Sequence, residues 1–190
     1  VVPQDKPGET AMMHAFHAIV TNTTKPLVLW APDGATARAV LDMHEAVVGM
    51  DAAERPMVLL CNTVTSPLVW DENSSDVVME AARRGIPQGP TTCPIAGMTA
   101  PMSLSGFVSQ AMAEVLSGLV LAQAVRPGAP VCVTFAVMTG DMREGTPILC
   151  TPEAMLLRAA IGQLVQYYDL PGLMAAFDSD AHAMDEQNGW

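Results

Sequence analysis

The feature that most constrains the fold is a recurring pattern of short apolar runs, each followed by a polar loop and a helical stretch. The runs begin near Leu27, Met57, Ile86, Val131 and Gly172. Continuous apolar runs are typical of strands buried on both faces of a parallel sheet. Strands that alternate with helices form βα units, so the pattern predicts an α/β fold with about five consecutive units. Five units fit either a doubly wound sheet or part of an eight-stranded barrel.

Capping residues predict where several elements begin and end. Asp33 or Thr36 is expected to cap a helix that runs to about Val48, and Gly49 is expected to stop it. Thr151, followed by Pro and Glu, is expected to open another helix that reaches about Tyr168. The expected strands are residues 27–30, 57–62, 86–92, 130–137 and 172–177, and the other expected helices are residues 76–84 and a long one from about Met102.

Charge and motif content exclude several functions. Nine Lys and Arg stand against twenty Asp and Glu, and the net charge of -11 argues against binding to nucleic acid. No GxGxxG or GxxxxGK[ST] motif follows an expected strand, which argues against the usual nucleotide-binding sites. The polar loops that follow the strands predict a catalytic edge at the carboxyl ends of the sheet.

The four cysteines, Cys61, Cys93, Cys132 and Cys150, form no CxxC pair. We interpret them as reduced core residues of a cytoplasmic protein, and a zinc site is the alternative interpretation. Residues 102–125 are long and apolar enough to cross a bilayer, but internal polar residues favour a buried helix and no membrane association. The chain opens at Val1 without a charged and apolar leader, so we expect no signal peptide and interpret both ends as cut.

Six short motifs occur in one order along the chain. They are residues 21–27 (TNTTKPL), 65–68 (TSPL), 97–101 (GMTAP), 126–131 (RPGAPV), 141–145 (DMREG) and 180–189 (DAHAMDEQNG). Each motif is short, but their order and spacing resemble the trimethylamine methyltransferase family over nearly the whole chain. In the last motif, His182, Asn188 and Trp190 stand where the family usually has Lys, Ala and Tyr.

The resemblance implies a fold, an activity and a partner. It implies that residues 1–190 form a single domain, a fragment of a (β/α)8 TIM-type barrel. The implied activity is transfer of a methyl group from a methylated amine to cobalamin, a corrinoid carried by a partner protein. No residue is written as pyrrolysine. Active family members without pyrrolysine demethylate quaternary amines such as glycine betaine, so a quaternary amine is the expected substrate, and a homo-oligomeric full-length form is left open.

Three residues are the predicted catalytic set. Asp141 follows the fourth expected strand and could face an ammonium group, while Arg143 could bind a substrate carboxylate. The alternative is that these two residues pair with each other or cap their loop. His182, in the loop after the fifth strand, could hydrogen-bond in its neutral form without repelling a cation. The alternative for that loop is a solvated acidic segment.

Further residues are predicted to bind the substrate or the corrinoid. Phe135 and Phe177 could hold a cation on their aromatic faces, or could be core residues. Asp180 and Gln187 are expected beside Asp141 and Arg143 at the barrel mouth, because loops after parallel strands share one rim. We assign the corrinoid contact to Ser66 and to Thr99, whose helix start offers backbone N–H groups to an anion, although a plain helical turn is equally consistent.

Two other functions remain open at this point. One keeps the barrel but makes the chain a zinc-dependent methyltransferase of the uroporphyrinogen decarboxylase-like kind, and it requires Cys and His ligands. The other is a truncated or degenerate protein that only binds a partner or a ligand.

Overall fold

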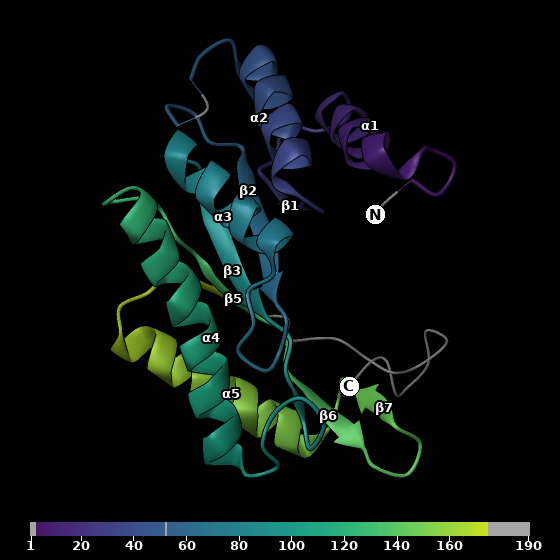
Figure 1. The fold of residues 1–190 in the computed structure, drawn as a ribbon, viewed down its shortest axis with the longest axis vertical. Helices are drawn as coiled ribbons and strands as arrows, with labels where there is room; N and C mark the ends of the chain where they lie inside the picture. The colour runs from purple at the N-terminus through teal and green to yellow at the C-terminus, as the bar shows by residue number, and fades with distance from the viewer. Residues whose placement is uncertain (1–2, 52, 175–190) are drawn as a thin grey trace. The chain divides into compact units, whose positions relative to one another are not determined.

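The computed structural model describes residues 3–51 and 53–174 (Figure 1). Helices and strands alternate over this part of the chain, as an α/β fold requires. The helices are α1 (Gly8–Val20), α2 (Gly34–Val48), α3 (Glu72–Arg84), α4 (Leu104–Val125) and α5 (Pro152–Tyr167). The strands are β1 (Leu27–Trp30), β2 (Val58–Val64), β3 (Gln88–Thr92), β4 (Ile95–Ala96), β5 (Val133–Phe135), β6 (Met138–Asp141), β7 (Thr146–Ile148) and β8 (Gly172–Met174).

The main sheet is parallel and has the strand order β1-β2-β3-β5-β8. Strand β1 pairs in parallel with β2, β3 with β5, and β5 with β8. Its strands follow one another in chain order, and a helix separates each from the next. The expectation of an α/β fold with consecutive βα units is therefore confirmed. Closure into a TIM-type barrel stays a prediction, because these five strands are only consistent with part of one.

The described chain divides into two compact units. The first unit holds the residues up to Asn62 together with Trp70–Pro90 and Gly118–Val131. The second unit holds Thr63–Val69, Thr91–Ser117 and the described residues from Cys132 on. The boundary between them passes through β2, β3 and α4. That residues 1–190 form a single domain stays a prediction.

The core of the first unit lies between the helices and one face of the sheet. Leu29 of β1 and Leu60 of β2 pack there with Phe16 of α1 and Leu41 of α2, all of them buried. Side chains alternate between the two faces of a strand, so the residues on either side of Leu29 point the other way. Accordingly Val28 and Trp30 are 56% and 48% exposed.

Capping explains the helix boundaries. The Asp33 side chain accepts a hydrogen bond from Thr36 N at the start of α2, and Gly49 ends that helix with φ 70. Thr151 accepts from Ala154 N at the start of α5. These three predictions are confirmed. The expected start of α3 at residue 76 is wrong, because Asp71 accepts from Ser74 N and begins the helix at Glu72.

The second unit contains a small sheet that the sequence pattern did not predict. The expected strand 130–137 is shorter in the structure, since β5 ends at Phe135. The chain then continues into β6, which forms an antiparallel hairpin with β7 and pairs in parallel with β4. The guanidinium of Arg158 donates to the Val137 carbonyl at 3.1 Å, in the short segment between β5 and β6.

Helix α4 is apolar, and it carries one buried carboxylate. By length and composition it could cross a membrane, with a mean hydropathy of 1.4 over its most apolar window. Core helices of water-soluble proteins meet the same criterion. Glu114 lies in the middle of this helix, is 1% exposed and accepts hydrogen bonds from several segments of the second unit.

Candidate functional site

Three segments that follow parallel strands belong to the second unit. They are the loop Thr65–Val69 after β2, the segment from β4 to the start of α4 after β3, and the β6–β7 hairpin after β5. Loops that follow parallel strands lie at the carboxyl end of a sheet, where α/β proteins hold their ligands. We call these three segments the rim loops.

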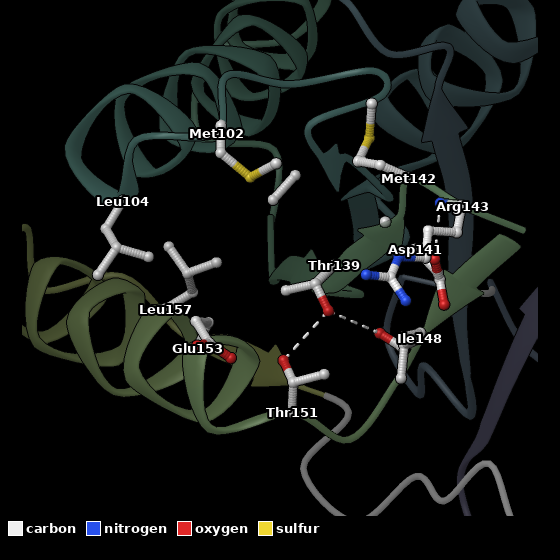
Figure 2. Close-up of a pocket in the computed structure, with 12 residues that line it drawn as sticks. Met102, Leu104, Thr139, Asp141, Met142, Arg143, Ile148, Thr151, Glu153 and Leu157 are labelled. Carbon is white, nitrogen blue, oxygen red and sulfur yellow. Dashed lines mark hydrogen bonds between the residues drawn. The ribbon is translucent and has the colours of Figure 1, made fainter. Parts of the chain in front are cut away.

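A cavity of about 580 Å³ lies among the last two rim loops and the start of α5 (Figure 2). It has carboxylate, guanidinium, hydroxyl, thioether and aliphatic groups on its walls. The lining residues are Ala96, Met102, Leu104, Thr139, Gly140, Asp141, Met142, Arg143, Ile148, Thr151, Glu153 and Leu157. Thioether and aliphatic groups contact methyl groups well, and carboxylates attract a cation. This composition suits a small methylated cation.

Asp141 and Arg143 both line this cavity, as the sequence predicted for residues of one site. Asp141 ends β6, and its Oδ1 accepts hydrogen bonds from Arg143 N at 2.8 Å and Glu144 N at 3.2 Å. The Asp141 carbonyl accepts from Gly145 N at 2.8 Å, which closes the turn. Asp141 therefore caps its loop, which was one of the two predicted alternatives. Its contact with an ammonium group, and that of Arg143 with a carboxylate, stay predictions.

Arg158 attaches the hairpin to α5, a role that was not predicted from the sequence. The side chain is 5% exposed, and its guanidinium donates to the carbonyls of Val137 at 3.1 Å and Leu149 at 2.9 Å. These carbonyls lie just before and just after the hairpin. Thr139 Oγ1 also lies 3.1 Å from Thr151 Oγ1, the cap of α5. The sequence signal was a lone arginine in the apolar helix segment LLRAAIG.

Ser66 and Thr99, the predicted corrinoid contacts, have hydrogen-bond partners inside the protein, Ser66 on helix α4 and Thr99 within its own rim loop. Ser66 Oγ donates to Glu114 Oε2 at 2.8 Å. Thr99 Oγ1 accepts from Ile95 N at 2.9 Å. Neither residue lines the cavity that contains Asp141. Both hydroxyls thus have a role in loop structure, and their contact with a corrinoid stays a prediction.

Phe135 lies away from that cavity. It is 3% exposed and is in register with Thr92, whose hydroxyl bonds to Glu114 of helix α4. Neighbouring residues in register point to the same face of a sheet, so Phe135 faces the helices. It lines a second cavity of about 280 Å³ with residues of α5 and β8. The structure gives Phe135 the core position that was the alternative to a substrate wall.

Four of the predicted site residues lie outside the described residues. They are Phe177, Asp180, His182 and Gln187. Their place beside Asp141 and Arg143 stays a prediction.

The four cysteines form no disulfide with one another, and they differ in burial. Cys61, Cys93 and Cys132 are half-buried, whereas Cys150 is exposed, so the expectation that all four are core residues is wrong for Cys150. Cys150 lies between the end of β7 and Thr151, the residue that caps α5. Burial raises the pKa of the Cys93 and Cys132 thiols, and the charge of Glu114 adds to the effect at Cys93. Both thiols are therefore poor nucleophiles at neutral pH.

Comparison with known proteins finds relatives that match the sequence over its whole length. The family described as trimethylamine methyltransferase (MTTB) matches residues 1–190. The trimethylamine methyltransferase MttB of Methanosarcina thermophila is 34% identical over 100% of this chain and 40% of its own length. That of Desulfitobacterium hafniense DCB-2 is 34% identical over 98% of this chain and 38% of its own length.

A relative with a different substrate in its name also matches. The glycine betaine methyltransferase of Desulfitobacterium hafniense Y51 is 30% identical over 99% of this chain and 40% of its own length. The chain thus spans about two fifths of the curated relatives that it matches. Because the family match covers every residue, the chain belongs to the trimethylamine methyltransferase family.

Proposed function

We propose that the intact protein transfers a methyl group from a methylated amine to the cobalt of a corrinoid carried by a partner protein. The observation that carries this proposal is the family match over residues 1–190. The relatives named above are methyltransferases, and their names include both trimethylamine and glycine betaine. The cavity beside Asp141 supports the proposal through its mixture of apolar and anionic walls.

A quaternary amine is the proposed substrate, since one matching relative is named glycine betaine methyltransferase. A quaternary ammonium group already carries a positive charge, so a neutral amine leaves when its methyl group departs and no general acid is required. The site then has to position the methyl group and keep water away. A corrinoid bound beside the cavity would supply the cobalt nucleophile for the methyl group.

The chain's own residues have distinct proposed roles. Asp141 and Glu153 attract the ammonium group into the cavity, since both carboxylates line it. Met102 and Met142 contact its methyl groups and exclude water. Arg143 binds a carboxylate such as that of a betaine. In Figure 2 the two thioether side chains lie on one side of Thr139, and Thr151 and Glu153 lie on the other.

The residues after β8 complete the proposed site. Phe177, Asp180, His182 and Gln187 lie outside the described residues, and we propose a place for them beside the β6–β7 hairpin because they come after a parallel strand of the main sheet in the sequence. Neutral His182 and Gln187 can hydrogen-bond to the substrate without repelling its charge. No observation favours the zinc-dependent or the non-catalytic alternative over this proposal.

The test is methyl transfer by the intact protein to cob(I)alamin. Formation of methylcobalamin is followed by absorbance with glycine betaine, other quaternary amines and trimethylamine as donors. We expect transfer from a quaternary amine. Transfer from trimethylamine alone would refute the proposed substrate class, and no transfer from any methylated amine, with the cognate corrinoid protein present, would refute the activity.

A further inference from the structure

Glu114 is a buried carboxylate with four hydrogen-bond donors. It is 1% exposed and lies in the part of α4 that belongs to the second unit. Its Oε1 accepts from Leu68 N at 3.0 Å and Gln110 Nε2 at 2.9 Å. Its Oε2 accepts from Ser66 Oγ at 2.8 Å and from Thr92 Oγ1. An ionised carboxylate can accept about four hydrogen bonds, so this group is saturated.

The donors come from separate segments of the chain. Ser66 and Leu68 belong to the rim loop after β2, and Thr92 ends β3. Gln110 lies one helical turn before Glu114, and its amide also donates to the Thr99 carbonyl at 2.8 Å. That carbonyl is part of the rim loop after β3. Glu114, together with Gln110 of the same helix, therefore links two consecutive rim loops.

The loop that Glu114 holds has a strained backbone. Leu68 has φ 59, in the left-handed region that side chains with a Cβ seldom adopt, and its side chain is 62% exposed. Such a conformation costs about 1 kcal/mol or more and persists only where neighbours enforce it. Two neighbours do so here. The bond from Leu68 N to Glu114 is one, and the backbone pairing of Thr65 with Val69 is the other.

We infer that Glu114 is the positioning residue of the rim, which fixes the loop Thr65–Val69 against the loop after β3. Glu114 is too enclosed to reach a substrate, so it acts through Ser66, Leu68 and the Gln110–Thr99 link. The inference rests on the proposed function for its catalytic consequence. Its structural consequence, an ordered loop after β2, is independent of that function.

Two variants of the intact protein separate these consequences. Glu114→Gln keeps an oxygen for Leu68 N and Gln110, and its amide can donate to the hydroxyls of Ser66 and Thr92, which are able to accept. Glu114→Met has a similar volume but accepts from none of the four donors. Hydrogen exchange by mass spectrometry reads the amides of residues 65–69 directly. We expect Glu114→Met to speed their exchange by roughly tenfold or more, and Glu114→Gln to change it far less.

A matched pair of milder variants keeps the test usable if Glu114→Met does not fold. Ser66→Ala and Thr92→Val each remove one hydroxyl that donates a hydrogen bond to the same oxygen of Glu114, Oε2. We expect Ser66→Ala to speed exchange in the loop 65–69, and Thr92→Val to leave that loop close to wild type. Equal effects of the two variants on the loop would overturn the inference.

Kinetics give the second readout. Misplaced rim loops reduce the turnover of bound substrate, so we expect Glu114→Met to lower kcat by about tenfold or more with a smaller change in KM. Glu114→Gln should recover most of the rate. Unchanged exchange at Leu68 in a folded Glu114→Met variant would overturn the inference. Faster loop exchange in a protein that transfers no methyl group would instead uphold the positioning role and refute the proposed function.

Discussion

Glu114 and Asp141 are two carboxylates of the same unit that both hold rim loops, yet their surroundings are opposite. Glu114 is 1% exposed and accepts from four donors, three of them 22 or more positions away in the sequence. Asp141 is half-buried, lines a cavity and accepts from two backbone amides of its own turn. Within the described part of the chain both of those bonds fall on Oδ1, which leaves Oδ2 for another partner.

The difference separates a structural carboxylate from an available one. A saturated buried carboxylate has no lone pair left for a ligand, and its removal leaves several donors unsatisfied. Replacing a partly exposed carboxylate that caps a turn by a neutral side chain costs little stability. In the unaltered protein, the charge of that carboxylate acts on the neighbouring cavity. The rim loops are thus held by one carboxylate that is fully engaged in structure, Glu114, and by one that a ligand can reach, Asp141.

The largest effect is expected from Glu114→Leu, which tests the structural side of the comparison. Loss of the buried acceptor leaves Leu68 N, Gln110 and two hydroxyls unsatisfied, so the free energy of unfolding should fall by about 3–5 kcal/mol. Urea unfolding of the intact protein measures it. Glu114→Gln is the control and should cost less than half as much. A loss below about 1 kcal/mol would mean that the cluster is not structural.

A smaller loss of stability is expected from Arg158→Met. This variant extends the comparison to a buried cation that holds the hairpin carrying Asp141. Its guanidinium holds the carbonyls of Val137 and Leu149 on either side of the hairpin. We expect the free energy of unfolding to fall by about 2 kcal/mol and the amides of residues 138–148 to exchange faster. Arg143→Met, an exposed arginine on the same hairpin, serves as the control. Equal losses for the two variants would contradict this role for Arg158.

The third prediction concerns His44, a buried ionisable side chain of the first unit. Its burial favours the neutral form over the charged form. His44 is 1% exposed, and its Nε2 accepts from Met57 N at 3.1 Å. Burial lowers its pKa below the ordinary 6.5, against the weaker opposing effect of Glu45. The unfolded chain therefore binds this proton at higher pH than the folded chain does. Stability from this group is complete above pH 6.5 and is lost as pH falls below that value.

The measurement is urea unfolding at about pH 7.5 and about pH 5.5. His44→Gln should remove part of the stability loss at the lower pH, because glutamine does not titrate and can still accept from Met57 N. The same pH dependence in wild type and His44→Gln would show that this histidine does not contribute.

The smallest stability effect is expected from Asp141→Asn, which tests the accessible side of the comparison. Asparagine keeps an oxygen for Arg143 N and Glu144 N, so stability should change by no more than about 0.5 kcal/mol. The lost charge should raise KM for a quaternary amine by about threefold or more. Glu144→Gln removes an equal charge from the same turn and is the control. An equal rise in KM for both variants would assign the effect to net charge rather than to Asp141.

Local signals in the sequence predicted much of the fold. Asp33, Gly49 and Thr151 set helix ends through hydrogen bonds to residues a few positions away, and such pairs are visible in the sequence. The main parallel sheet followed from the apolar runs. The β6–β7 hairpin was missed because residues 138–148 lack a clear alternating pattern, and its position depends on Arg158 of a later helix.

The candidate site was predictable only in part. Asp141 and Arg143 share one turn, so their proximity was evident from the sequence. Ser66 was assigned to a cofactor, whereas its hydroxyl bonds to a residue of α4 that lies 48 positions away. A long-range contact of this kind depends on the packing of α4 against the ends of β2 and β3, which no local pattern encodes. Glu114 itself was noticed only as a polar interruption of an apolar helix.

The half-exposed face of β1 gives the protein an optical reporter. Trp30 is 48% exposed beside Val28, on the face opposite the core of the first unit. Indole fluorescence shifts to shorter wavelength when water is displaced from the ring, so the emission of Trp30 responds to anything that covers this face. Trp30→Phe supplies the background emission from Trp70 and Trp190. A difference spectrum can thus follow, in real time, whether further polypeptide packs on the sheet.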